Sequence, residues 1–545
     1  MREIITLQLG QQSNYVGTHF WNTQESYFTY GADEESPVDH NVHFRPGLGV
    51  DGTETFMPRT VIYDLKGGFG TLRKLNALYE VSDNAAPGGL WSGQTVVHRQ
   101  PPIEASAYQE SLDTGQTPPE LNTSTVRYWS DFNRVFFHPR SIIQLNEYEL
   151  NSTLMPFEKW HMGEELFASL DKEHDLVDRD LRPFVEEADQ MQGIQILAGL
   201  DDAWAGFAAK YVERLRDEYG KTPVWVFGVQ EPTMGLSREK RLTKLVNKAR
   251  ALTELNSQAS LVVPFGLPES PLPDSVYIDP ASPWHVSALY AAALESTTLY
   301  TRLKTSDRVY STNLGNMADL LNVFGKQTIA NIEFSPVDVK EKQQNGTNGF
   351  GEILNGRGDR IASLYNSVLN EDTLESRSSK DTVSLDIDLS SPQDLNLDPG
   401  RRRRRKRHIF SQVQTYRGPK EDVTNGEQNG DDEMMDEDYV MRSRPKVHEY
   451  RSAMSFPLID SYPKIFRRPH RPDPDDAAAA AAAMPMRTAL SADTSVTDKV
   501  RALRAAVVQS IGLEDRETVG NELAEIAESY REGWSSGSDE DDDDE

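Results

Sequence analysis

The sequence has 545 residues, which is enough for two or three domains with a sizeable buried core. Its formal net charge is −29, and the chain stays acidic without the run of carboxylates at 539–545. This argues against nucleic acid or anionic lipid as the partner of the whole surface. There is no cysteine, so disulfides, thiolate metal sites and a cysteine nucleophile are excluded.

No stretch reaches the roughly 18–20 apolar residues that a membrane span needs. Residues 1–8 predict a strand, and Glu3 is unlike the residues of an amphipathic presequence. If the protein serves an organelle, we expect it to act from the cytosolic side.

Strands and helices are expected to alternate along the first part of the chain. In order they are strand 3–9, helix 14–30, strand 60–65, helix 72–79, helix 180–191, strand 193–198, helix 203–219 and strand 222–228. This order predicts an α/β fold, a Rossmann-type parallel sheet with helices on both faces, in which ligands sit at the carboxyl ends of the strands. Residues 100–160 lack a clear period, and we expect an insertion at about 100–175.

The composition changes after residue 335. Polar segments there predict disorder, while 456–466 and a helical pair at 496–534 predict ordered structure. We therefore expect a partly disordered α+β C-terminal region. The expected parts are an N-terminal domain at 1–335, a largely disordered linker at 336–450, a segment with helices at 451–534 and an acidic disordered tail at 535–545.

Three ordered blocks of the sequence resemble tubulins. The first runs without a gap from Met1 to Trp21, the second covers 56–65, and the third is Gln-Gly-Ile-Gln at 192–195. The resemblance implies that residues 1–335 form a tubulin-like domain.

Other segments resemble one branch, the Misato/DML family. They are Trp-Ser-Gly at 91–93 running into 98–104, the insertion that follows, and Phe-Ser-Gln at 410–412. The resemblance implies a role in mitochondrial distribution and in the inheritance of mitochondrial DNA, especially in fungi. It also implies protein partners of the cytoskeleton or the mitochondrial surface, and a mitochondrial location with a cytoplasmic pool.

The nucleotide site of tubulins depends on a Gly-Gly-Gly-Thr-Gly-Ser-Gly run, whose backbone N–H groups hold the phosphates. At the matching positions this chain has Asp201, Asp202, Ala203, Trp204, Ala205, Gly206 and Phe207. Each added Cβ restricts the approach of the backbone to a phosphate, and the two carboxylates repel its oxygens. The sequence therefore predicts a degenerate phosphate loop and no GTP hydrolysis.

Two interpretations of Asp201 and Asp202 stay open. Either they cap the helix that begins near Ala203, which we favour, or they take part in a metal or ligand site. The residues that match a tubulin site are Gly10, Gln11, Gln12 and Asp64. Weak GTP binding therefore stays open, and no other cofactor and no metal is expected.

A basic run lies within the polar region and consists of Arg401, Arg402, Arg403, Arg404, Arg405, Lys406 and Arg407. It either neutralises acidic segments of the same chain, binds anionic lipid or an acidic protein, or contacts nucleic acid. We expect a non-catalytic tubulin-like protein that acts in mitochondrial partitioning. The alternatives are a GTPase with a rebuilt phosphate loop, and an adaptor that binds nucleic acid or anionic lipid through 401–407.

Overall fold

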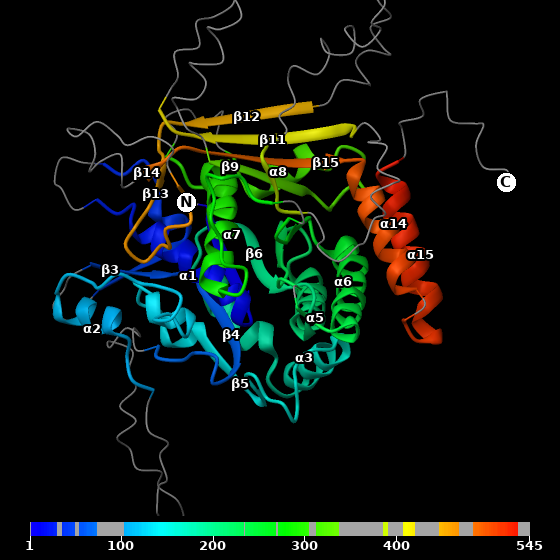
Figure 1. The fold of residues 1–545 in the computed structure, drawn as a ribbon, viewed down its shortest axis with the longest axis horizontal. Coiled ribbons are helices and arrows are strands. Elements are labelled where there is room, and N and C mark those ends of the chain that lie inside the picture. The colour runs from blue at the N-terminus through cyan, green and yellow to red at the C-terminus, as the bar shows by residue number, and fades with distance from the viewer. Residues whose placement is uncertain are drawn as a thin grey trace, which may run out of the picture.

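The computed structural model describes most of the N-terminal part of the chain and several segments of the C-terminal part. The described residues are 2–29, 35–48, 54–72, 103–233, 235–268, 271–304, 312–336, 385–390, 407–419, 446–467, 483–508 and 510–531. They form two large sheets with helices packed around them (Figure 1). The acidic tail and most of the predicted linker lie outside these residues, so their disorder stays a prediction.

The larger sheet has six strands in the order β5-β4-β1-β6-β7-β8, and every pair is parallel. Its strands are β1 (Glu3–Leu9), β4 (Thr60–Lys66), β5 (Ile142–Glu149), β6 (Met191–Gly199), β7 (Val224–Val229) and β8 (Leu261–Phe265). β1, β7 and β8 are buried along their whole length, as in parallel sheets covered on both faces. The predicted α/β class is confirmed.

Helices cover both faces of this sheet (Figure 1). Side chains alternate along β1, so that Ile5 packs in one hydrophobic core and Ile4 in the other. The Ile4 side holds α1 (Gln11–Glu25) and α7 (Pro283–Thr298). The Ile5 side holds α3 (Trp160–His174), α5 (Ala203–Glu218) and α6 (Arg238–Gln258).

Part of the predicted insertion at 100–175 belongs to the sheet. β5 pairs with β4 as an edge strand, and α3 packs directly against α5. Two glycines permit this approach, because a Cβ at Gly163 would lie 1.8 Å from the Ala203 carbonyl oxygen and one at Gly206 would lie 2.3 Å from the Trp160 carbonyl oxygen. The periodicity of β5 is weak because much of this edge strand is exposed.

The second sheet has the order β10-β9-β15-β11-β12. Its strands are β9 (Asn331–Pro336), β10 (Ile387–Asp388), β11 (Ile409–Arg417), β12 (Lys446–Ser452) and β15 (Met486–Asp493). β11 lies inside the range predicted to be a largely disordered linker, so that prediction is wrong for this segment. Its polar composition was misleading, because polar side chains such as Gln412 are themselves buried.

The C-terminal helices pack on the larger domain. The helical pair predicted at 496–534 corresponds to α14 (Ser495–Val507) and α15 (Leu513–Ser529), and both helices contact α6. The remaining elements are β2 (Phe44–Leu48), β3 (Glu54–Pro58), α2 (Ala107–Thr114), α4 (Arg182–Glu186), α8 (Leu314–Leu321), β13 (Phe456–Pro457) and β14 (Ala483–Met484). Among the described residues, no helix combines the length and apolar character needed to cross a bilayer.

Candidate functional site

The predicted nucleotide-site residues meet at the carboxyl ends of the larger sheet. Gly10 and Gln11 follow β1, Asp64 lies near the end of β4, and Asp201 and Asp202 follow β6. Because parallel strands end at one edge, residues far apart in the sequence become neighbours there. The structure therefore brings together the residues that sequence analysis selected.

The space next to Gly10 is filled by Trp204. Gly10 has φ +87°, and a Cβ on it would lie 2.4 Å from the Trp204 Nε1 atom, so the indole lies directly against the glycine backbone. Trp204 is 5% exposed, and its ring packs against Phe157 and Phe207 at centroid distances of 5.3 and 5.5 Å. A phosphate that approached the Gly10 backbone would have to displace this indole.

Asp202 occupies the N-terminus of α5, where tubulins would place a phosphate. It is the N-cap residue, and its Oδ1 accepts a hydrogen bond of 2.9 Å from the Trp204 N–H. Burial, reinforced by the charge of Asp201, raises the pKa of Asp202 to about 8. The anion-binding end of the helix is thus satisfied by a side chain of the same chain.

Asp201 does not cap the helix, and here the capping interpretation is wrong. Its Oδ2 accepts hydrogen bonds from Lys244 Nζ at 3.0 Å and from the Glu231 N–H at 3.2 Å, and Lys244 Nζ also reaches Glu231 Oε2 at 2.9 Å. Burial alone would lower the pKa of Lys244, but the two carboxylates hold it above its usual range. The ammonium group of Lys244 is therefore the cation of this site.

Lys244 was not predicted from the sequence. It lies on α6, a helix with many basic residues, and nothing in its spacing separates it from the exposed ones. Its role becomes visible only because α6 packs beside the loop that follows β6.

Asp64 and Gln11 contact each other. The Asp64 Oδ2 atom accepts hydrogen bonds from Asn14 Nδ2 at 2.7 Å and Gln11 Nε2 at 3.1 Å, and Gln11 also donates to the Gly68 carbonyl oxygen at 2.6 Å. Burial raises the pKa of Asp64 to about 7. Gln12 lies half-buried in the first turn of α1. The retained polar groups are thus largely occupied by one another.

The other positions of the degenerate loop form part of the packing of α5. Ala203, Ala205 and Phe207 are fully buried, and the Phe207 ring contacts Phe167 of α3 at 5.2 Å. Together with Gly206, they support the close contact between α3 and α5 rather than a ligand.

One group of carboxylates among the described residues is close enough to hold a cation, namely Asp175, Asp178 and Glu218. Arg182 pairs with Asp178 and Glu218, and Arg214 pairs with Asp175 and Glu218. Two guanidinium groups thus already neutralise this cluster.

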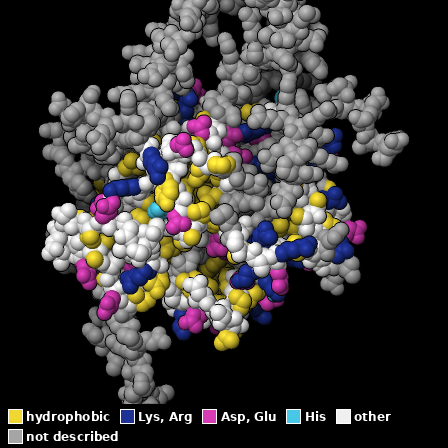
Figure 2. Space-filling view, viewed as in Figure 1, with side chains coloured by type: hydrophobic (Ala, Val, Ile, Leu, Met, Phe, Trp, Pro, Cys, Tyr) yellow, Lys and Arg dark blue, Asp and Glu magenta, His cyan; other side chains and the backbone are white. Residues whose placement is uncertain are grey.

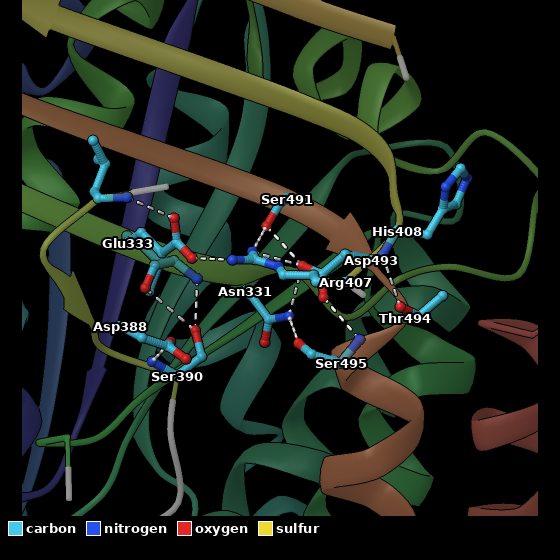
Figure 3. A network of polar contacts seen from close by, with 12 residues as sticks. Asn331, Glu333, Asp388, Ser390, Arg407, His408, Ser491, Asp493, Thr494 and Ser495 are labelled. Atoms are coloured by element: carbon cyan, nitrogen blue, oxygen red, sulfur yellow. Dashed lines mark hydrogen bonds and ion pairs between the residues drawn. The ribbon is translucent and has the colours of Figure 1, made fainter. Parts of the chain in front are cut away.

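The last residue of the basic run points into the protein (Figure 3). Arg407 forms ion pairs with Glu333 of β9 and with Asp493 of β15, the latter at 2.8 Å, and it donates to Ser491 Oγ at 2.6 Å. For Arg407, the contacts therefore agree with the interpretation that the basic run neutralises acidic residues of the same chain. Residues 401–406 lie outside the described residues, as does the block at 91–102.

Comparisons with known proteins agree with the fold. Residues 118–303 match a family model described as a tubulin domain, and residues 2–114 match one described as the Misato Segment II tubulin-like domain. Fold and matches together define a tubulin-like α/β protein.

Curated relatives identify the branch. The chain is 52% identical to the protein dml-1 of Neurospora crassa and 46% identical to DML1 of Gibberella zeae, with 100% of both chains covered in each case. It is 34% identical to dml1 of Schizosaccharomyces pombe over 63% of this chain and 74% of that protein. The chain belongs to the Misato/DML1 family of tubulin-like proteins.

Proposed function

We propose that this chain is a non-catalytic member of the tubulin-like class and that it acts through binding. The observation that carries the proposal is the indole of Trp204 on the backbone of Gly10. Catalysis of phosphoryl transfer depends on positioning the phosphates and stabilising their charge. Here an indole fills the space over the Gly10 backbone, and the side chains of Asp201 and Asp202 follow β6 next to it.

The cellular role in this proposal is the distribution of mitochondria and the inheritance of their DNA. It rests on membership of the Misato/DML1 family, and it includes protein partners of the cytoskeleton or the mitochondrial surface. The protein would act on the cytosolic side of the mitochondrion, with a cytoplasmic pool.

Turnover of GTP by the purified full-length chain in the presence of Mg²⁺ tests the catalytic part of the proposal. We expect phosphate release no faster than in buffer. Hydrolysis that depends on Mg²⁺ and is lost in a Gln11→Ala variant would favour a GTPase with a rebuilt loop.

A complementation experiment tests the cellular part. Cells that lack the gene should show misplaced mitochondria, and the intact chain should restore their distribution. Normal mitochondria and mitochondrial DNA in the deleted cells would contradict the proposed role.

A further inference from the structure

The connection between β5 and α3 carries an exposed apolar tip. Leu154 is 93% exposed and Met155 is 55% exposed, and the adjacent Pro156 is exposed as well. Figure 2 shows hydrophobic side chains at the lower tip of the molecule, where Figure 1 places this connection. A run of three exposed apolar residues is unfavourable in water and is avoided in loops unless it has a function. The run at 154–156 therefore indicates a function.

The tip stands on a fixed base. The Met155 N–H donates to Ser152 Oγ at 3.2 Å, and the ring of Phe157 packs between Tyr148 at 4.8 Å and Trp204 at 5.3 Å. Trp204, which packs on the backbone of Gly10, therefore also supports this loop. The tip is presented to solvent in a defined position rather than as a loose chain.

The shape of the tip favours a lipid surface over a protein partner. Three side chains on one loop offer far less area than the about 800 Å² that a stable protein interface buries on each partner. A bilayer interface accepts an apolar wedge without a matching surface. We propose that residues 154–156 insert into the interfacial region of a lipid bilayer.

The charges near the tip permit this contact. Lys240 of α6 binds Glu158 of the loop at 3.1 Å, which places the first turns of α6 beside the tip. Between 147 and 159 the charged residues are Glu147, Glu149, Glu158 and Lys159, and the first turn of α6 carries Arg238, Glu239, Lys240 and Arg241. The balance is close to neutral although the chain carries −29. Binding should therefore depend on apolar contact and only weakly on salt.

This inference adds a membrane contact to the proposed function, and purified lipid tests it independently of any mitochondrial role. Full-length protein is floated with vesicles of phosphatidylcholine, alone or mixed with phosphatidylserine, at low and high salt. We expect weak binding to both. The double variant Leu154→Ser, Met155→Ser should bind at least about 10-fold less, because each apolar side chain contributes about that factor. Phe324→Ser, at another residue that is 53% exposed, is the matched control and should bind normally.

The absence of cysteine permits a second, site-specific measurement. A single cysteine at Leu154 is labelled with an environment-sensitive fluorophore, and a cysteine at Phe324 serves as the control. Insertion predicts that vesicles shift the emission of the label at 154 to the blue and leave the label at 324 unchanged.

Three results would overturn the proposal. Wild type that binds no vesicles shows that the tip is not a lipid wedge. Binding restricted to anionic vesicles and abolished when 401–406 are replaced by serine, with the buried Arg407 kept, assigns the contact to the basic run. Loss of mitochondrial location in the double variant without any vesicle binding assigns the tip to a protein partner.

Discussion

Trp204 combines two functions at one position. Its indole fills the space over Gly10, and its other side supports Phe157 at the base of the β5–α3 connection. A threonine at this place, as in the tubulin run, would leave both contacts unmade. Trp204 is thus also part of the hydrophobic core.

Trp204→Ala should therefore lower stability rather than create a nucleotide site. Removing a buried tryptophan costs about 3–5 kcal/mol, because it loses buried area and leaves a cavity. Equilibrium unfolding in urea measures this loss, and Trp204→Phe should lose clearly less. Gain of GTP binding in the alanine variant would contradict the view that Asp202, as the N-cap of α5, keeps the anion-binding end of the helix occupied without the indole.

Lys244→Met should be strongly destabilising. It leaves Asp201 buried without its cation, and breaking a buried pair on one side costs about 3–5 kcal/mol. Lys210→Met is a suitable control, because Lys210 pairs with Glu213 at the surface, and it should cost less than about 1 kcal/mol. The double variant Lys244→Met, Asp201→Leu should recover much of the loss. If Lys244→Met and the control Lys210→Met lost equal stability, the role of Lys244 would be contradicted.

Asp64 predicts a pH dependence. Its pKa is about 7 in the folded chain and about 4 when unfolded, so the folded state holds the proton more tightly. Between about pH 4 and 7 this group makes the free energy of unfolding fall as pH rises. Asp64→Asn removes this pH-dependent contribution. The free energy of unfolding of the variant, relative to that of the wild type, should therefore increase as pH rises from about 4 to 7. If the free energies of unfolding of the variant and the wild type differed by a constant amount between about pH 4 and 7, the raised pKa of Asp64 would be contradicted.

At the scale of elements, a buried ion cluster joins the two sheets. Glu295 of α7 binds Arg302 at 2.6 Å and also pairs with Arg417 of β11, while the Tyr27 hydroxyl donates to Glu295 at 2.8 Å. Both arginines and the glutamate are fully buried. The cluster fixes β11 against α7 and explains why this polar strand is ordered.

Arg417→Met tests this joint. It leaves the Glu295 carboxylate with fewer partners in the core, and we expect a loss of about 3–5 kcal/mol in urea unfolding. Arg451→Met provides the control, since Arg451 is half-exposed on the edge strand β12. If Arg417→Met lost no more stability than Arg451→Met, the buried ion cluster would not be what holds the second sheet in place.

Sequence patterns predicted the elements that have strong periods. β1, β6 and α5 were expected at nearly the observed bounds, because an apolar strand or an amphipathic helix carries its own signal. β5 and β11 were missed, since an exposed edge strand and a strand of buried polar residues have compositions typical of loops. These segments form ordered strands because of contacts with residues far away in the sequence, such as that of Arg417 with Glu295.

The same limit applies to the candidate site. Loss of the glycine run was visible in the sequence, and so was the capping of α5 by Asp202. The indole on Gly10 and the pairing of Lys244 with Asp201 were not, because they depend on how α6 and the β5–α3 connection pack at the carboxyl edge.

At the scale of the whole molecule, the hydrophobic cores of the N-terminal domain include residues beyond 335. The core on one side of the larger sheet includes Val500 and Leu523 of the C-terminal helices, and the core on the other includes Val413 and Leu490 of the second sheet. Nucleotide and lipid assays should therefore use the full chain, since a fragment 1–335 would expose both surfaces.

Nucleotide content is the most direct test of a filled phosphate site. Full-length protein, purified without added nucleotide, is denatured in acid and the supernatant is analysed for guanine nucleotides by chromatography. We predict none, and we predict an unfolding temperature that GTP with Mg²⁺ leaves unchanged. Release of GTP or GDP at about one per chain, or a rise in the unfolding temperature with GTP, would contradict the conclusion that the chain's own side chains occupy the site.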